Sequence, residues 1–97
     1  FDNNFCLSDA RTELRDVLTL TGASGLAMTV ATTEPGIQIY DGRDAIRPGQ
    51  RSHEGLAIEA QLWPDATNNR RFPSIILGPQ TPYSQITQWR FSGTTDP

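Results

Sequence analysis

The chain has 97 residues, enough for one hydrophobic core and too few for a second autonomous domain. Its hydrophobic content of 36% and charged content of 20% are typical of globular proteins and exclude disordered and fibrous classes. The net charge of -3, with arginines scattered along the chain, argues against a nucleic-acid partner, because no basic field gathers phosphates.

Cysteine usage and hydropathy set further expectations. The single cysteine, Cys6, can form no internal disulfide and lacks the companions of a structural zinc site, so we expect a small buried apolar residue. No stretch approaches the ~20 apolar residues of a membrane span, and no leader opens the chain. We therefore expect no membrane partner, no metal and a cytoplasmic location. Because Phe1 is not an initiating methionine, we expect a fragment or a processed piece.

The first third of the chain predicts a β-hairpin. Residues alternate in polarity from Asp16 to Thr21 and from Leu26 to Ala31, on either side of a Gly-rich turn. The second run places Met28 on the same face as Leu26 and Val30, so Met28 is expected in the core. A weak helical pattern covers only Arg11 to Val17.

A second strand pair follows the hairpin. Pro35-Gly36 is a turn signal, and the strand Ile37 to Tyr40 after it displays Gln38 and Tyr40 on the face opposite its isoleucines. Asp41 to Ser52 is expected to be a surface loop. The run from Gly55 to Gln61 alternates again, with Glu59 on its polar face.

The remainder completes an all-β prediction. Ser74 to Leu77 and Tyr83 to Phe91 are expected to be strands, and Gly93 to Pro97 a frayed tail. Short strands separated by Gly and Pro turns favour a sandwich. About six strands would leave long unpaired edges, so we expect partner strands from outside this sequence.

Glu59 is the sharpest candidate for chemistry. On spacing alone a solvated outer face is the commoner explanation of a strand acid. Gln38 and Tyr40 repeat the same polar layout, however, and Trp63 lies just beyond the strand, where its ring could cover an apolar sugar face. Acid, amide and aromatic groups together suit a neutral polyhydroxylated ligand.

Two further residues have open interpretations. Asp2 could hydrogen-bond a ligand hydroxyl, or it could cap a turn, which composition alone favours. His53 is a lone loop histidine, which is usually structural or solvated, and it cannot supply a metal cluster by itself.

Three segments resemble one family. TTEPGIQIYDG at Thr32 to Gly42 and GLAIEAQLWPDATNNRRFPSIIL at Gly55 to Leu77 look like the aldose 1-epimerases, or galactose mutarotases. The opening DNNFCL at Asp2 to Leu7 is similar to the DHNF-type segment of the same family. The segments occur in the family's order and cover nearly the whole chain, so together they are highly specific.

The resemblance implies a fold and a set of roles. Residues 1–97 would be the C-terminal part of one large galactose mutarotase-like β-sandwich domain. Glu59, in the family's LETQ-type position, would be the general base at the C1 hydroxyl of the sugar, and Asp2 and Gln38 would bind substrate. No cofactor is implied. In the family that the chain resembles, the general acid and an assisting residue are histidines from upstream segments, and such segments would also be needed to complete the fold.

The implied activity is interconversion of the α and β anomers of free aldoses such as galactose or glucose, through ring opening by acid and base. A non-catalytic sugar-binding relative that keeps Asp2, Gln38 and Trp63 is an alternative. A mutarotase for phosphorylated hexoses is another, and it should show arginines clustered near the cleft. Arg70 and Arg71 are adjacent but fall in a loop, which ranks that alternative lower.

Overall fold

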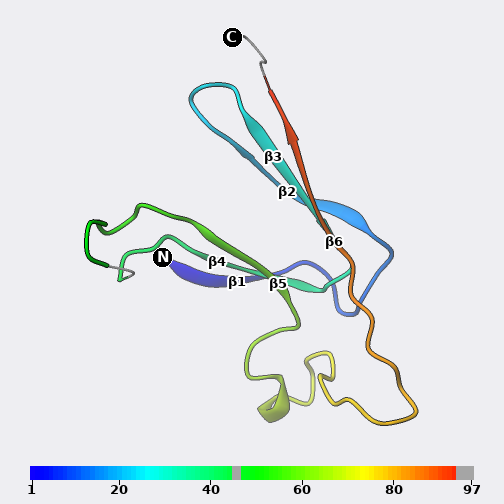
Figure 1. The fold of residues 1–97 in the computed structure, drawn as a ribbon. Coiled ribbons are helices and arrows are strands. Elements are labelled where there is room, and N and C mark those ends of the chain that lie inside the picture. The colour runs from blue at the N-terminus through cyan, green and yellow to red at the C-terminus, as the bar shows by residue number, and fades with distance from the viewer. Residues whose placement is uncertain (45–46, 94–97) are drawn as a thin grey trace.

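The computed structural model describes residues 1–44 and 47–93, which form two three-stranded antiparallel sheets (Figure 1). One sheet has the order β1-β4-β5 and the other β2-β3-β6. The strands are β1 (Asp2–Cys6), β2 (Arg15–Thr21), β3 (Ala27–Thr32), β4 (Gly36–Tyr40), β5 (Ala57–Gln61) and β6 (Thr87–Ser92). One 3-10 turn, η1 (Ala66–Asn68), lies between β5 and β6. The all-β prediction is confirmed for the described residues.

The β2-β3 hairpin forms where the alternation predicts it. Leu20 pairs with Met28 and Leu18 with Val30, and the register shifts between Asp16 and Leu18. Because paired residues share a face, these four side chains line one apolar side of the sheet. β6 continues that side, since Trp89 pairs with Val30. Val30 is fully buried and Met28 is half-buried.

The segment between β3 and β4 joins the two sheets and is the most buried part of the chain. Thr32, Glu34, Pro35 and Ile37 are each almost inaccessible to solvent. The Pro35 carbonyl accepts hydrogen bonds from the Leu7 amide at 2.8 Å and from Trp63 Nε1 at 2.9 Å. This segment therefore fixes where β4, which carries Gln38, begins.

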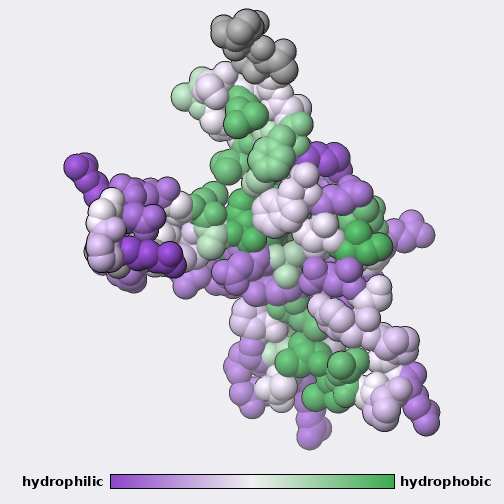
Figure 2. Space-filling model, in the orientation of Figure 1, coloured by the Kyte–Doolittle hydropathy of each residue, from purple (hydrophilic) through white to green (hydrophobic). Residues whose placement is uncertain are grey.

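Away from this junction the two sheets diverge (Figure 1). The radius of gyration is 16.2 Å, whereas a compact domain of this length has about 13 Å. Large apolar side chains consequently reach the surface, both on the β2-β3-β6 sheet and on the loops before β6 (Figure 2). Examples are Leu26, Ile76, Leu77 and Phe91, which are 54%, 75%, 65% and 66% exposed.

Several local predictions need correction. The weak helical pattern from Arg11 to Val17 is wrong, since Arg15 already begins β2. Ser74 to Leu77 forms no strand, and the last strand begins at Thr87, later than predicted. Cys6 is exposed and not buried as expected, because it lies at the end of β1, an edge strand of the described sheet that the alternation did not predict.

The predicted loop between β4 and β5 is present in its described part, and positions 45–46 of it lie outside the described residues. Most of the predicted tail, positions 94–97, also lies outside them. Within the described residues no helix has the length and apolar character needed to cross a membrane.

Candidate functional site

The β1-β4-β5 sheet has one polar and one apolar face. Asn3 pairs with Ile39, and Ile39 pairs with Ile58, so the apolar side chains of β4 and β5 share one side. The opposite side carries the residues of the other parity. These are Asp2, Asn4 and Cys6 from β1, Gly36, Gln38 and Tyr40 from β4, and Ala57, Glu59 and Gln61 from β5.

The structure brings the three predicted site residues to this polar face. Gln38 pairs with Asn4 on one side and with Glu59 on the other, so Asn4, Gln38 and Glu59 form a row across the sheet. Side chains paired in this way have Cβ atoms about 4.5–5.5 Å apart. Gln38 Nε2 also donates a hydrogen bond of 2.7 Å to Asp2 Oδ1. A group that contacts Glu59 is thus within reach of Gln38 and Asp2.

The Glu59 carboxylate is exposed at the edge of the described sheet. Among the described residues no side chain donates a hydrogen bond to this carboxylate or forms an ion pair with it. Its strand is held in place from the other side by the half-buried Ile58 and Ala60. A carboxylate offered in this way can accept a proton or a hydrogen bond from a ligand.

Two polar residues, Gln61 and Asn4, join the sequence-based candidates on this face. Gln61 Nε2 donates to Gln38 Oε1 and to Asn4 Oδ1, each at 3.1 Å. The alternation along the strand already placed Gln61 on the same face as Glu59. Asn4 could not be found in that way, because its position depends on the pairing of β1 with β4.

Gly36 provides the space for the Gln61 bridge. It lies opposite Gln61 on β4, between that residue and β1. A Cβ atom there would stand 2.7 Å from Asn4 Oδ1, 3.0 Å from Trp63 Cδ1 and 3.2 Å from the Gln61 carbonyl oxygen. A side chain at position 36 would therefore crowd the Asn4 oxygen that accepts the bond from Gln61.

The Trp63 side chain is held by contacts within the protein. Its indole N–H is bonded to the Pro35 carbonyl, and its ring packs edge-to-face on Phe72 with centroids 5.1 Å apart. The ring is half-buried. The suggested contact between Trp63 and a sugar stays a prediction.

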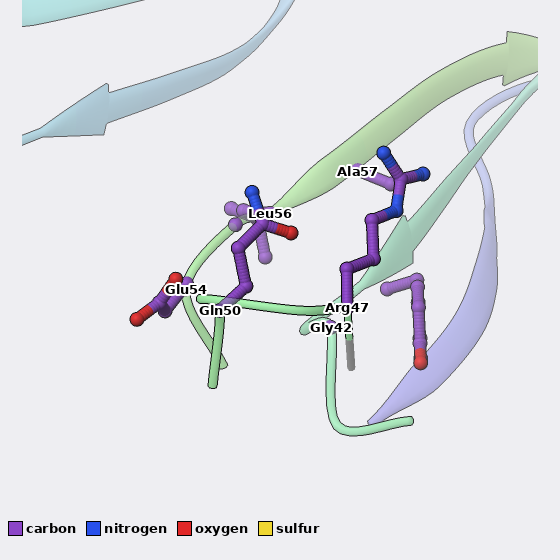
Figure 3. A pocket seen from close by; sticks show the side chains of 8 residues that line it. Gly42, Arg47, Gln50, Glu54, Leu56 and Ala57 are labelled. Carbon is purple, nitrogen blue, oxygen red and sulfur yellow. The ribbon is translucent and has the colours of Figure 1, made fainter. Parts of the chain in front are cut away.

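A pocket of about 340 Å³ lies at the end of the polar face, where Tyr40 pairs with Ala57. The loop between β4 and β5 supplies Arg47, Gln50 and Glu54 to its lining. In Figure 3 the Arg47 side chain extends towards Ala57, and the Glu54 carboxylate points away from Arg47. The pocket therefore lies two residues along the strands from Gln38 and Glu59.

His53 lies in the same loop and contacts Asp41. Its Nδ1 is 3.5 Å from Asp41 Oδ2 and the imidazole is 56% exposed, in agreement with a structural or solvated histidine. No three His, Cys, Asp or Glu side chains of the described residues gather closely enough to hold a metal ion.

Comparisons with known proteins agree with the motif evidence. A sequence model of the family described as aldose 1-epimerase matches residues 1–90. The galactose mutarotases of Rattus norvegicus and Homo sapiens are each 37% identical to the chain over 99 residues, and that of Bos taurus is 34% identical. Each alignment covers 95% of this chain and 29% of the relative, so the chain spans less than a third of the length of these curated proteins. A search of solved structures found no significant match. The family match over nearly all of the sequence shows that the chain belongs to the aldose 1-epimerase family.

Proposed function

We propose that the chain is the C-terminal part of an enzyme that interconverts the α and β anomers of a free aldose such as galactose or glucose. The observation that carries this proposal is the shared face of Asp2, Gln38 and Glu59 on the β1-β4-β5 sheet, where Gln38 lies beside Glu59 and is bonded to Asp2. Glu59 would act as the general base, and the other two residues would hold sugar hydroxyls.

The chemistry suits these groups. Opening a cyclic hemiacetal requires a base that removes the proton of the C1 hydroxyl and an acid that protonates the ring oxygen. Rotation about the C1–C2 bond and ring closure then give the other anomer. The exposed Glu59 carboxylate can take the C1 proton, and the Asp2 and Gln38 side chains can bond hydroxyls on the same ring.

The acid is proposed to come from an upstream segment of the same protein. His53 is the single histidine of the chain, and it is paired with Asp41 in the loop after β4. The exposed apolar side chains, such as Phe91 and Ile76, give the same segment a surface to cover. This segment would therefore complete both the fold and the mechanism.

The cytoplasmic location of the protein also stays a prediction.

A mutarotase for phosphorylated hexoses is the second candidate, and Arg47 is the observation that favours it. Arg47 lines the pocket beside Tyr40 and Ala57, two strand positions from Gln38 and Glu59. Residues two apart on a strand are about 6.6 Å apart, so a phosphate on a sugar held at Glu59 could reach it. Glu54 lines the same pocket and opposes an anion there, which ranks this candidate below the neutral aldose.

Polarimetry of the complete protein tests the proposal. Freshly dissolved α-glucose and α-galactose should reach their equilibrium rotation faster with the enzyme than without it. Glu59→Gln keeps the shape of the side chain but removes the base, and its rate should fall by about 10²- to 10⁴-fold. Glu13→Gln, an exposed acid outside the site, is the matched control and should keep the wild-type rate. Full activity of Glu59→Gln would show that the base has been assigned wrongly.

A further inference from the structure

Gln61 is bonded to two residues of the candidate site and is itself half-buried. Its Nε2 donates to Gln38 Oε1 and to Asn4 Oδ1 at the same distance, 3.1 Å. Gln38 and Asn4 are half-buried too, whereas Asp2 and Glu59 are exposed. The bonds of Gln61 therefore lie beneath the groups that would touch a ligand.

The direction of the hydrogen bonds follows from Asp2. As a carboxylate, Asp2 can only accept, so Gln38 must turn its NH₂ group towards it. The Gln38 carbonyl oxygen then faces the opposite way, towards Gln61, and requires a donor there. Gln61 meets that requirement with its own NH₂ group. The donors thus run in one direction, from Gln61 through Gln38 to Asp2.

We infer that Gln61 is a positioning residue for the sugar site, which acts by fixing the amide of Gln38 and, through it, the carboxylate of Asp2. The inference rests on the proposed function. With both ends of its amide held, Gln38 keeps one N–H and one lone pair for the ligand. A sugar hydroxyl can accept from the first and donate to the second, so the fixed amide is matched to a neutral hydroxyl group.

Asn4 and Gly36 support this role. Asn4 Oδ1 is the second acceptor for Gln61 and prevents its amide from turning away from the sheet. Gly36 has no side chain in the path between Gln61 and Asn4, and a Cβ atom would stand 2.7 Å from the Asn4 oxygen. The bridge therefore depends on three strands at once, and its effect should reach the ligand only through Gln38.

The test is steady-state mutarotation of the complete protein with Gln61→Met, which keeps the length of the side chain and removes its donor. A lost neutral hydrogen bond should raise KM by about 2- to 10-fold, while kcat stays within about 2-fold because the reacting atoms are untouched. Gln80→Met, in the exposed turn between Gly78 and Pro82, is the control and should change neither constant. An unchanged KM, or a loss confined to kcat, would overturn the inference.

A double-mutant cycle separates positioning from a general structural role. In a Gln38→Ala background, Gln61→Met should raise KM no further, because the residue through which it acts is gone. Equal and additive effects of the two substitutions would contradict the inference.

If Gln61→Met fails to fold, Gln61→Glu replaces it in both measurements. Glutamate keeps the shape of the side chain but has an acceptor where a donor is required. The KM of the Gln61→Glu variant should rise at least as much as that expected for Gln61→Met. Absence of mutarotation in the wild-type protein would defeat the proposed function. An active wild type with an indifferent Gln61 would defeat only this inference.

Discussion

Arg11 and Glu34 form a two-pronged ion pair at the junction of the two sheets. Arg11 Nε donates to Glu34 Oε2 at 2.8 Å, and Arg11 Nη2 donates to Oε1 at 3.1 Å. The Glu34 side chain is 1% exposed and that of Arg11 is 33% exposed. These hydrogen bonds hold the pKa of the Arg11 guanidinium above its ordinary value, although burial acts in the opposite direction. The arginine thus compensates a carboxylate that water does not reach.

Arg11→Met should lower the free energy of unfolding by about 2 kcal/mol, because it leaves the Glu34 charge buried. The cost is set below that of a fully buried pair, since Arg11 is partly solvated and Thr33 Oγ1 also donates to Glu34. Replacing both partners, as Arg11→Met with Glu34→Leu, should cost less than Arg11→Met alone. Urea unfolding of the complete protein measures both.

The control for this prediction is the ion pair between Arg90 and Asp16. Its contacts are equally short, with Arg90 Nη2 at 2.8 Å and 2.7 Å from the two carboxylate oxygens, but one nitrogen makes both contacts and the side chains are 50% and 60% exposed. Arg90→Met should change the free energy of unfolding by no more than about 0.5 kcal/mol. Equal costs for Arg11→Met and Arg90→Met would mean that burial does not set the value of the pair.

The period of two was sufficient to find the candidate site residues of β4 and β5, but not those of β1. It placed Gln38 and Glu59 on the polar faces of their strands, and both strands formed close to the predicted residues. It did not bring those faces together, because strand pairing depends on contacts between residues far apart in the sequence. The motif resemblance supplied that information, as it did for the roles of the residues.

The errors have the same origin. Asp2 to Cys6 contains two asparagines and an aspartate, residues that are rare in strands, yet β4 pairs with the segment along its whole length. Ser74 to Leu77 is rich in strand-forming residues, but no described strand lies beside it to complete its hydrogen bonds. Pairing overrides local preference in both segments.

Gly36→Ala should destabilise the protein and weaken sugar binding together. The new Cβ atom would crowd the Gln61 carbonyl and the Trp63 ring, neither of which can move freely, at a cost of about 1–3 kcal/mol in the free energy of unfolding. It would also push Asn4 away from Gln61, so KM should rise as in Gln61→Met. Gly78→Ala, where a Cβ atom meets open space, should leave both quantities unchanged. A Gly36→Ala protein with wild-type stability would contradict the close contacts at this position.

Gly42→Ala tests how tightly the loop that frames the pocket is closed. Gly42 has a φ of 77°, and a Cβ atom would stand 2.7 Å from the Gly55 carbonyl oxygen, a backbone atom that cannot turn aside. Strain and contact together should lower the free energy of unfolding by about 2–4 kcal/mol.

Gly25→Ala separates the two contributions, because Gly25 has a φ of 90° and a Cβ atom added there would meet no other atom within 4 Å. That variant should cost only the strain of a left-handed residue, about 1 kcal/mol. The difference between the two, measured by chemical denaturation, is the contribution of the contact between Gly42 and Gly55. If the two variants lose the same stability, that contact relaxes without cost and the loop does not hold the pocket rigidly.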